Sequence, residues 1–236
     1  MALLGAFSLL PAAYASENGG AIFQHLTTQP GAGAGAKKSK DELRGHTDAV
    51  FHALPGEART GCSVSPDFVV LIGLRNPGPT YTRVISLTPL LKLHLAAHEV
   101  SALLDPVFDV SPQPSFALGG LVEHDLSLAK HSAHGYVMRY SNTKVVADPH
   151  LHPKQDAVLQ KVSSILTSPP PGLVDRVAVN PGDILFINNR VALHGRDKVA
   201  HATPGGSSRW IVRTYGVNAS SVPLHPQSPG ACVLMP

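Results

Sequence analysis

Three segments of the chain carry the hydrophobic pattern of β-strands, and two of them are continuous apolar runs. Residues 67–77 (DFVVLIGLRNP) are rich in β-branched residues and end in turn-forming residues, as expected of a buried strand. A shorter apolar run, ILFI at 184–187, follows the turn-forming residues PGD at 181–183. This second run predicts a strand that ends shortly before His194.

The third segment, residues 208–217 (SRWIVRTYGV), alternates between two kinds of position. Successive side chains of a strand point to opposite faces, so every second residue shares a face. One face would then carry Arg209, Ile211, Arg213 and Tyr215, and the other Trp210, Val212 and Thr214. Two arginines on one face leave room for a carboxylate between them.

Two segments have the apolar spacing of helices. Residues 89–104 predict the longer one, with Thr88 as the N-cap and Pro89 at the first helical position. Residues 154–166 predict a second, shorter helix. Both are expected to pack outside a β core.

Composition fits one domain built mainly from strands. With 236 residues, 43% of them hydrophobic, the chain is long enough for one sizeable core. Its 21 Gly and 21 Pro, with only 15% charged residues, imply many turns, which fits a sandwich or barrel. We predict a single domain over 1–236, with a mobile loop at 31–40, a flexible connection at 167–172 and a Pro-rich tail at 218–236.

Candidate metal ligands lie far apart in the sequence. His46-Thr47-Asp48 is the only place where an acid follows a His by two positions, although the 13 His and 16 acids would give about one such triplet by chance. His194 offers a second imidazole. Two imidazoles and one carboxylate can fill one face of a hexacoordinate Fe(II), which leaves positions for a co-substrate and O2. A downstream arginine can grip an acidic co-substrate through paired hydrogen bonds. This set of residues predicts a non-haem Fe(II), 2-oxoglutarate-dependent oxygenase.

Several motifs in this order resemble the clavaminate synthase-like branch of the Fe(II)/2-oxoglutarate-dependent dioxygenases, which includes hydroxylases of asparagine and arginine. The matching segments are GHTDAVFH (45–52), LIGLRNP (71–77), GDILFINNRVALHGR (182–196) and RWIVR (209–213), with weaker matches at 14–26 and 105–116. The resemblance implies a double-stranded β-helix, or jelly-roll, with a few flanking helices. It also implies hydroxylation of an aliphatic C–H of a free or carrier-bound amino acid or related metabolite, with release of succinate and CO2.

The resemblance also assigns residues. It implies that His46, Asp48 and His194 bind Fe(II) and that Arg209 pairs with the distal carboxylate of 2-oxoglutarate. Arg213 would be a second cationic group nearby. The family uses a threonine from the strand after the LRNP turn, for which Thr82 is the best match and Thr80 an alternative.

The substrate is expected to contact the segment MRYSNTKVVA (138–147). Several members of the family carry acidic residues there to bind a cationic side chain. This chain has Ser141, Asn142 and Thr143 instead, so a neutral polar or small substrate is favoured over a strongly basic one. Asp148 is a further candidate.

Two alternatives remain open from the sequence. One is a metal-binding jelly-roll without turnover, suggested by the short segment before the first matching residues. The other is a zinc hydrolase, because His94 and His98 lie four apart with Glu99 adjacent, although the order H-E-x-x-H is absent. For His52 we expect a hydrogen-bonded role behind the metal motif, for Arg75 a turn or barrel-mouth contact, and for Arg196 a contact beside His194.

Partners and location follow from charge and cysteine content. The formal charge is +3, and the basic cluster KKSK at 37–40 lacks interleaved aromatics, which argues against a nucleic-acid site. No apolar run reaches the length of a membrane-spanning helix. Residues 1–18 imitate a secretory signal but carry no Lys or Arg, and Cys62 and Cys232 form no disulfide framework, so we expect a cytoplasmic protein. The sequence leaves the oligomeric state open.

Overall fold

The structure is a computed structural model that describes residues 2–29, 31, 37, 39–57, 63–78, 80–199, 209–218 and 232–234. Its larger sheet has the strand order β12-β4-β14-β1-β15, and a further strand, β2, pairs with β14. These strands are β1 (Leu9–Tyr14), β2 (Gln24–Thr27), β4 (Phe68–Arg75), β12 (Ile184–Asn188), β14 (Trp210–Asn218) and β15 (Cys232–Leu234).

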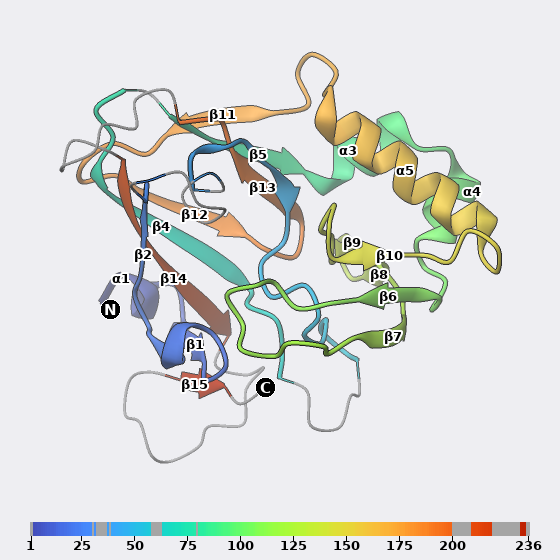
Figure 1. Cartoon of the computed structure of the whole chain (residues 1–236), viewed down its shortest axis with the longest axis horizontal. Helices are drawn as coiled ribbons and strands as arrows, with labels where there is room; N and C mark the ends of the chain where they lie inside the picture. The colour runs from blue at the N-terminus through green and yellow to red at the C-terminus, as the bar shows by residue number, and fades with distance from the viewer. Residues whose placement is uncertain are drawn as a thin grey trace.

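A second, four-stranded sheet has the order β11-β5-β13-β3. Figure 1 shows it above the larger sheet. One hydrophobic cluster includes Val69 and Ile211 of the larger sheet together with Ile85 and Leu193 of the smaller sheet, so the core joins the two. The strands of the smaller sheet are β3 (Leu43–His46), β5 (Tyr81–Ser86), β11 (Asp175–Ala178) and β13 (Ala192–Arg196).

The remaining strands and the helices flank these sheets (Figure 1). A three-stranded sheet, β10-β6-β7, consists of β6 (Phe108–Val110), β7 (Glu123–Leu126) and β10 (Val145–Val146), and β8 (Ala129–Ser132) forms a hairpin with β9 (Gly135–Met138). The helices are α1 (Ala2–Ala6), the 3-10 turn η1 (Asn18–Gly20), α3 (Leu87–His94), α4 (Ala97–Ala102) and α5 (Pro153–Thr167). The prediction of a mainly β protein with a few flanking helices is confirmed.

The strongest sequence patterns gave the expected elements. The three predicted strands correspond to β4, β12 and β14, and the helix predicted at 154–166 is α5. His194 lies beyond the end of β12, as the sequence predicted, and within a further strand, β13, that the sequence did not predict. The turn at 189–191 carries the chain from the larger sheet to the smaller one, and β13 begins immediately after it.

The single helix predicted at 89–104 is wrong, because two helices occupy this segment. Leu95 and Ala96 have extended backbone angles, so α3 ends at His94 and α4 begins at Ala97. The Glu99 carboxylate accepts a hydrogen bond from the Ala96 N–H at 2.7 Å, which supports a new helix start at this point. The N-cap of α3 is Ser86, and Thr88 lies inside the first turn.

Three segments predicted to be flexible are only partly described. In the stretch 31–40, the structure describes residues 31, 37, 39 and 40. Beyond Asn218 it describes Cys232–Leu234, which form β15 and pair in parallel with β1. At 167–172, α5 extends to Thr167, and the irregular stretch that follows ends in a turn at 171–172. Cys62 and residues 200–208 lie outside the described residues.

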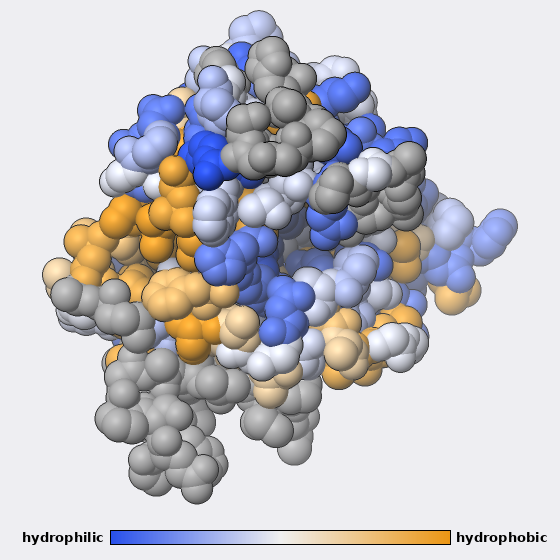
Figure 2. Space-filling view, turned by 60° about the vertical axis from the view of Figure 1, so that its left-hand side comes forward, coloured by the Kyte–Doolittle hydropathy of each residue, from blue (hydrophilic) through white to orange (hydrophobic). Residues whose placement is uncertain are grey.

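The outer face of the larger sheet is apolar. Val70 of β4 packs with Leu4 and Leu9 there, and the ring of Phe7 lies 5.0 Å from that of Phe186. Figure 2 shows hydrophobic residues gathered on one side of the molecule. None of the described helices is long and apolar enough to cross a membrane.

Candidate metal centre and substrate pocket

His46, Asp48 and His194 converge although almost 150 positions separate the first from the last. His46 ends β3, Asp48 lies in the turn that follows, and His194 is the direct cross-strand neighbour of His46. Asp48 Oδ1 lies 3.5 Å from His46 Nε2, and Asp48 Oδ2 lies 3.6 Å from His194 Nε2. One ligand atom from each residue falls within 4.8 Å of the others, and no other group of three such side chains was found among the described residues. The predicted ligands thus form one compact set.

The surroundings of both imidazoles suit metal binding. His46 Nδ1 lies 2.9 Å from the Arg44 carbonyl oxygen, which can only accept, so Nδ1 is a donor and Nε2, on the side of Asp48, is the nitrogen left to bind a metal. For His194, burial and then the nearby His46 lower the pKa below its ordinary value, which favours the neutral ring. Metal-ligating histidines must be neutral, so burial prepares this site for a cation.

Asp48 is a buried carboxylate held in its charged form. Burial alone would raise its pKa, but Arg213 and His194 outweigh that effect and hold the pKa well below the usual range. Its backbone is fixed by Asn189, whose Oδ1 accepts from the Asp48 N–H at 2.9 Å and whose Nδ2 donates to the Asp48 carbonyl at 3.1 Å. The charge and position of Asp48 are therefore set before any ligand arrives.

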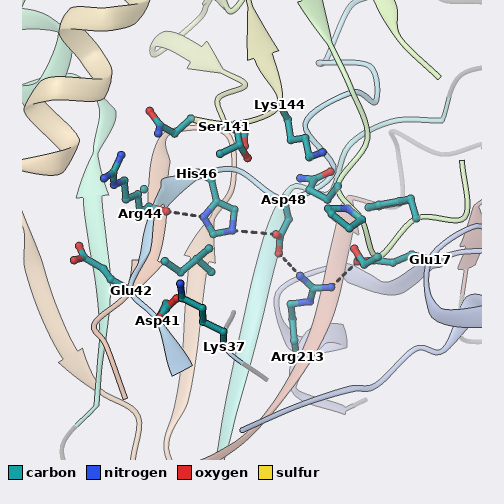
Figure 3. Close-up of a pocket in the computed structure, with 18 residues that line it drawn as sticks. Glu17, Lys37, Asp41, Glu42, Arg44, His46, Asp48, Ser141, Lys144 and Arg213 are labelled. Carbon is teal, nitrogen blue, oxygen red and sulfur yellow. Dashed lines mark hydrogen bonds and ion pairs between the residues drawn. The ribbon is translucent and has the colours of Figure 1, made fainter. Parts of the chain in front are cut away.

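Arg213 is enclosed by protein acceptors. It donates to Asp48 Oδ2 at 2.9 Å and to Glu17 Oε1 at 2.7 Å (Figure 3). It also donates to Gln24 Oε1. Burial by itself would lower the pKa of Arg213, but Asp48, Tyr215 and Glu17 raise it. The sequence suggested a second cation for the co-substrate at this position. The structure instead places Arg213 between two buried carboxylates.

Arg209 has a different environment. Its Nη2 donates to Thr82 Oγ1 at 3.4 Å, and its Nε is buried without a hydrogen-bond partner. Burial lowers its pKa to about 10, and Arg196 acts in the same direction. Among the described residues, no carboxylate forms an ion pair with Arg209. A buried cation of this kind suits an anionic ligand.

The structure also distinguishes between the two threonine candidates for 2-oxoglutarate binding. Thr82 lies on β5 and contacts Arg209, so the two residues assigned to 2-oxoglutarate by resemblance are neighbours. Thr80 precedes β5, and its backbone groups are hydrogen-bonded to the side chain of Asn76. The assignment of Thr82 stays a prediction that this contact supports.

A cavity of about 640 Å³ reaches the metal set from the side of Arg213. His46 and Asp48 line it, whereas His194, Arg209 and Thr82 do not. Ser141, Asn142 and Thr143 line it, and their contact with a substrate stays a prediction. Asp148 does not, because it is exposed in a turn where it accepts hydrogen bonds from the N–H groups of residues 150 and 151.

Some lining residues were not identified from the sequence. The cavity also contains Glu17, Gln113, Arg44 and Lys144 (Figure 3). Glu17 and Gln113 lie in the two weakly matching segments, 14–26 and 105–116, which was the available signal for them.

The structure does not support the alternative zinc site at His94 and His98. His94 ends α3 and His98 lies in α4, so the break between the helices removes their shared face. Glu99 is paired with Lys161 at 2.6 Å. His52 is fully buried, and its ring stacks on that of Tyr14 at 4.3 Å, so it packs in the core. Its hydrogen-bonded role behind the metal motif stays a prediction.

Arg75 and Arg196, the other two arginines singled out from the sequence, each contact a neighbouring residue. The guanidinium of Arg75 lies 5.9 Å from the ring centroid of Trp210. Arg196 donates to the Asp41 carbonyl at 2.6 Å, two residues beyond His194 on β13.

Comparisons with known proteins agree with the geometry. Residues 104–215 match the model of the taurine catabolism dioxygenase TauD, TfdA family. An L-asparagine oxygenase from Streptomyces coelicolor is 29% identical over 211 residues. The predicted resemblance to the Fe(II)/2-oxoglutarate-dependent dioxygenases is confirmed. The match covers 87% of this chain, but the chain spans only 57% of that relative's length.

Solved structures show the same fold. An asparagine oxygenase bound to Fe(II), (2S,3S)-3-hydroxyasparagine and succinate superposes with a TM-score of 0.76 at 24% identity, over 96% of this chain and 66% of that one. The non-haem iron oxygenase OrfP bound to Fe and α-ketoglutaric acid gives 0.65 at 23% identity, over 88% and 60%. The jelly-roll predicted from the sequence is therefore confirmed.

Proposed function

We propose that the chain is an Fe(II)/2-oxoglutarate-dependent oxygenase that hydroxylates an aliphatic carbon of an amino acid or a related metabolite. In this reaction 2-oxoglutarate, O2 and the substrate C–H become succinate, CO2 and the C–OH product. One oxygen atom enters succinate and the other enters the alcohol. The known relatives and the shared fold support this reaction class.

One observation carries the proposal: the structure combines a His-Asp-His set with a buried arginine, Arg209, that has no carboxylate partner among the described residues. Arg209 contacts Thr82 on β5, the strand that pairs with the His194 strand β13. The first feature suits a divalent cation with nitrogen and oxygen ligands, and the second suits the anion that would accompany it. A structural zinc site would require neither an arginine nor a cavity at its edge.

The residues divide the work between them. His46, Asp48 and His194 would hold Fe(II), which when bound supplies the oxidising chemistry that no side chain provides. Arg209 and Thr82 would orient the distal carboxylate of 2-oxoglutarate. The cavity beside Asp48 would place the substrate carbon next to the metal. Arg213 keeps Asp48 ionised by pairing with it.

The test is succinate formation from 2-oxoglutarate under air, with Fe(II) and ascorbate, together with a mass gain of one oxygen in a panel of amino acids. We expect Asp48→Ala to abolish iron-dependent succinate formation and His94→Ala to leave it unchanged. Metal retention without succinate would favour the alternative of a binding protein without turnover. Loss of bound metal in His94→Ala but not in His46→Ala would favour a zinc hydrolase and contradict the proposal.

The location proposed from the sequence is the cytoplasm, where Fe(II) and reduced thiols persist. The low cysteine content supports it. Fractionation of the producing cells, with the protein detected by antibody, tests this assignment.

A further inference from the structure

The charged side chains that line the substrate cavity fall into two groups. Those of the first group are already paired within the protein. Glu17 and Asp48 share the guanidinium of Arg213, and Glu42 forms an ion pair with Arg83. These carboxylates are therefore already engaged by arginines and are poorly placed to bind a cationic substrate.

The second group has an excess of positive charge. It consists of Lys37, Arg44 and Lys144 against the single carboxylate of Asp41, and none of these four forms an ion pair within the part of the chain that the structure describes. The first group has three carboxylates against the two cations Arg213 and Arg83, so the two groups together keep an excess of one positive charge. Fe(II) and 2-oxoglutarate carry opposite charges of equal size, so their binding would leave this excess in place. A ligand with net negative charge would offset it.

Lys144 is the best placed of these cations. It is half-buried, and its carbonyl oxygen accepts a hydrogen bond from the Ser111 N–H at 2.8 Å, which fixes its backbone. It directly follows Ser141, Asn142 and Thr143 on the cavity wall. Figure 3 shows Lys144 extending from that wall toward the side of the cavity where Asp48 and Glu17 lie. Arg44 lies across His46 from it in the same view.

We propose that the substrate is an acidic amino acid and that Lys144 binds its side-chain carboxylate. This inference rests on the proposed oxygenase function and narrows its substrate class. An acidic amino acid carries two carboxylates and one ammonium group, which matches an excess of cations with one free acid. A basic amino acid would add positive charge beside Lys144, and a neutral amide would leave the ammonium group of Lys144 without a counter-charge.

The experiment compares near-isosteric pairs, L-aspartate with L-asparagine and L-glutamate with L-glutamine, and adds L-arginine. Turnover is followed by succinate and by product mass. Binding is measured by calorimetry without O2, both with Fe(II) and 2-oxoglutarate and with the chain alone. We expect one acid to exceed its amide by at least about tenfold in kcat/KM and in affinity, as for a hydrogen bond between charged groups.

Variants test whether Lys144 causes the preference for the acidic substrate. Lys144→Met should lower kcat/KM for the acid by about 10- to 100-fold and change that for the amide by less than about threefold. Lys144→Arg keeps the charge and should retain the preference for the acid. Lys154→Met, which removes an exposed lysine on α5 outside the cavity, is the matched control and should behave like the parent.

The experiment distinguishes failure of the acidic-substrate proposal from failure of the proposed oxygenase function. An iron-dependent enzyme that prefers an amide or arginine, or whose preference survives in Lys144→Met, overturns the acidic substrate and leaves the oxygenase intact. Failure of all five amino acids to bind also overturns it. If His46→Ala binds as much metal as the parent, the proposed function itself fails, whatever the binding preference.

Discussion

At the scale of single residues, the position of Asp48 depends on its backbone contacts as much as on its carboxylate. Ala49, the next residue, is fully buried with φ of 51°, a conformation that costs a non-glycine residue about 1–2 kcal/mol. Asn189 offsets this cost. It bonds both backbone groups of Asp48 and donates to the Pro66 carbonyl at 3.1 Å. The turn that presents Asp48 is thus held by a residue from the β12–β13 connection.

Replacing Asn189 should therefore weaken metal binding more than its distance from the metal suggests. Asn189→Leu removes three buried hydrogen bonds, and we expect metal affinity to fall about 10- to 100-fold, as for other residues that orient a ligand. Stability should fall by about 2–4 kcal/mol because buried polar groups lose their partners. Metal titration at a temperature where circular dichroism shows the native fold measures the first effect, and urea unfolding measures the second.

Asn188→Leu provides the control. Asn188 is the last residue of β12, directly before Asn189, and the one hydrogen bond of its side chain within the described residues is from the N–H of Arg190 at 3.0 Å. The variant should bind metal like the parent. An equal loss of metal affinity in both variants would mean that the turn as a whole matters and that Asn189 has no specific role.

The sequence predicted which types of residue form the site but not which of them contact one another. The residue types and motif order predicted that His46, Asp48 and His194 would meet, and strand alternation placed Arg209 and Arg213 on one face. Alternation cannot say which partner each arginine meets, because Glu17 and Thr82 come from other parts of the chain. Lys144 was missed for the same reason, since its significance depends on which neighbouring charges are already paired.

At the scale of elements, the metal set depends on how closely β3 and β13 approach. Gly195, next to His194, faces the backbone of β3. An added Cβ would lie 2.3 Å from the Leu43 carbonyl oxygen and 3.1 Å from the Arg44 carbonyl carbon. Only glycine permits the spacing that sets His194 directly opposite His46.

We therefore expect Gly195→Ala to separate the two strands. Because backbone atoms cannot move aside as a side chain can, the substitution should destabilise the protein by about 1–3 kcal/mol. It should also weaken metal binding, since His46 moves with β3. Thermal unfolding with and without metal measures both effects.

Gly45→Ala on β3 is the comparison. Its added Cβ would meet only side-chain atoms, the nearest being Ile85 Cδ1 at 3.0 Å. These side chains can adjust, so the loss of stability should be smaller. The reverse order of stability would contradict the idea that backbone contact between β3 and β13 limits the site.

Element boundaries were predictable where a pattern was long and unambiguous. Strand β4 and helix α5 followed directly from apolar runs and helical spacing. The break between α3 and α4 was not foreseen, because apolar residues continue through it and a side-chain contact of Glu99 starts the second helix. Strand β13 was not predicted, because it is short and the sheet pairing that makes it a strand is non-local.

At the scale of the whole molecule, binding and stability are linked through Arg209. Without a ligand, a buried cation that has no carboxylate partner among the described residues costs free energy, and burial lowers its pKa to about 10. The protein therefore carries a local instability that an anionic ligand would relieve. A ligand at a hundredfold excess over its Kd adds about 2.7 kcal/mol, or roughly 5–10 °C in Tm for a chain of this size.

Most substitutions of a buried residue lower the Tm, but we expect Arg209→Ala to behave differently. Without ligand, its Tm should equal or exceed that of the parent, because the buried cation is gone. Anaerobic Fe(II) should raise the Tm of the parent and of Arg209→Ala equally, since the metal ligands are intact in both. The further gain from 2-oxoglutarate should disappear in the variant, because a buried carboxylate without its cation costs about 3–5 kcal/mol. Scanning calorimetry under the three conditions measures each step.

Two controls assign the effect to this arginine. Arg75→Ala removes a cation that lies over the Trp210 ring on the same sheet, and it should keep the full gain from 2-oxoglutarate. Arg213→Ala should lower the Tm without ligand, because it leaves Glu17 and Asp48 buried without their shared cation. If Arg209→Ala keeps the 2-oxoglutarate gain and Arg213→Ala loses it, the anchor of the co-substrate is Arg213. The buried pair with Asp48 would then have to open each time 2-oxoglutarate binds.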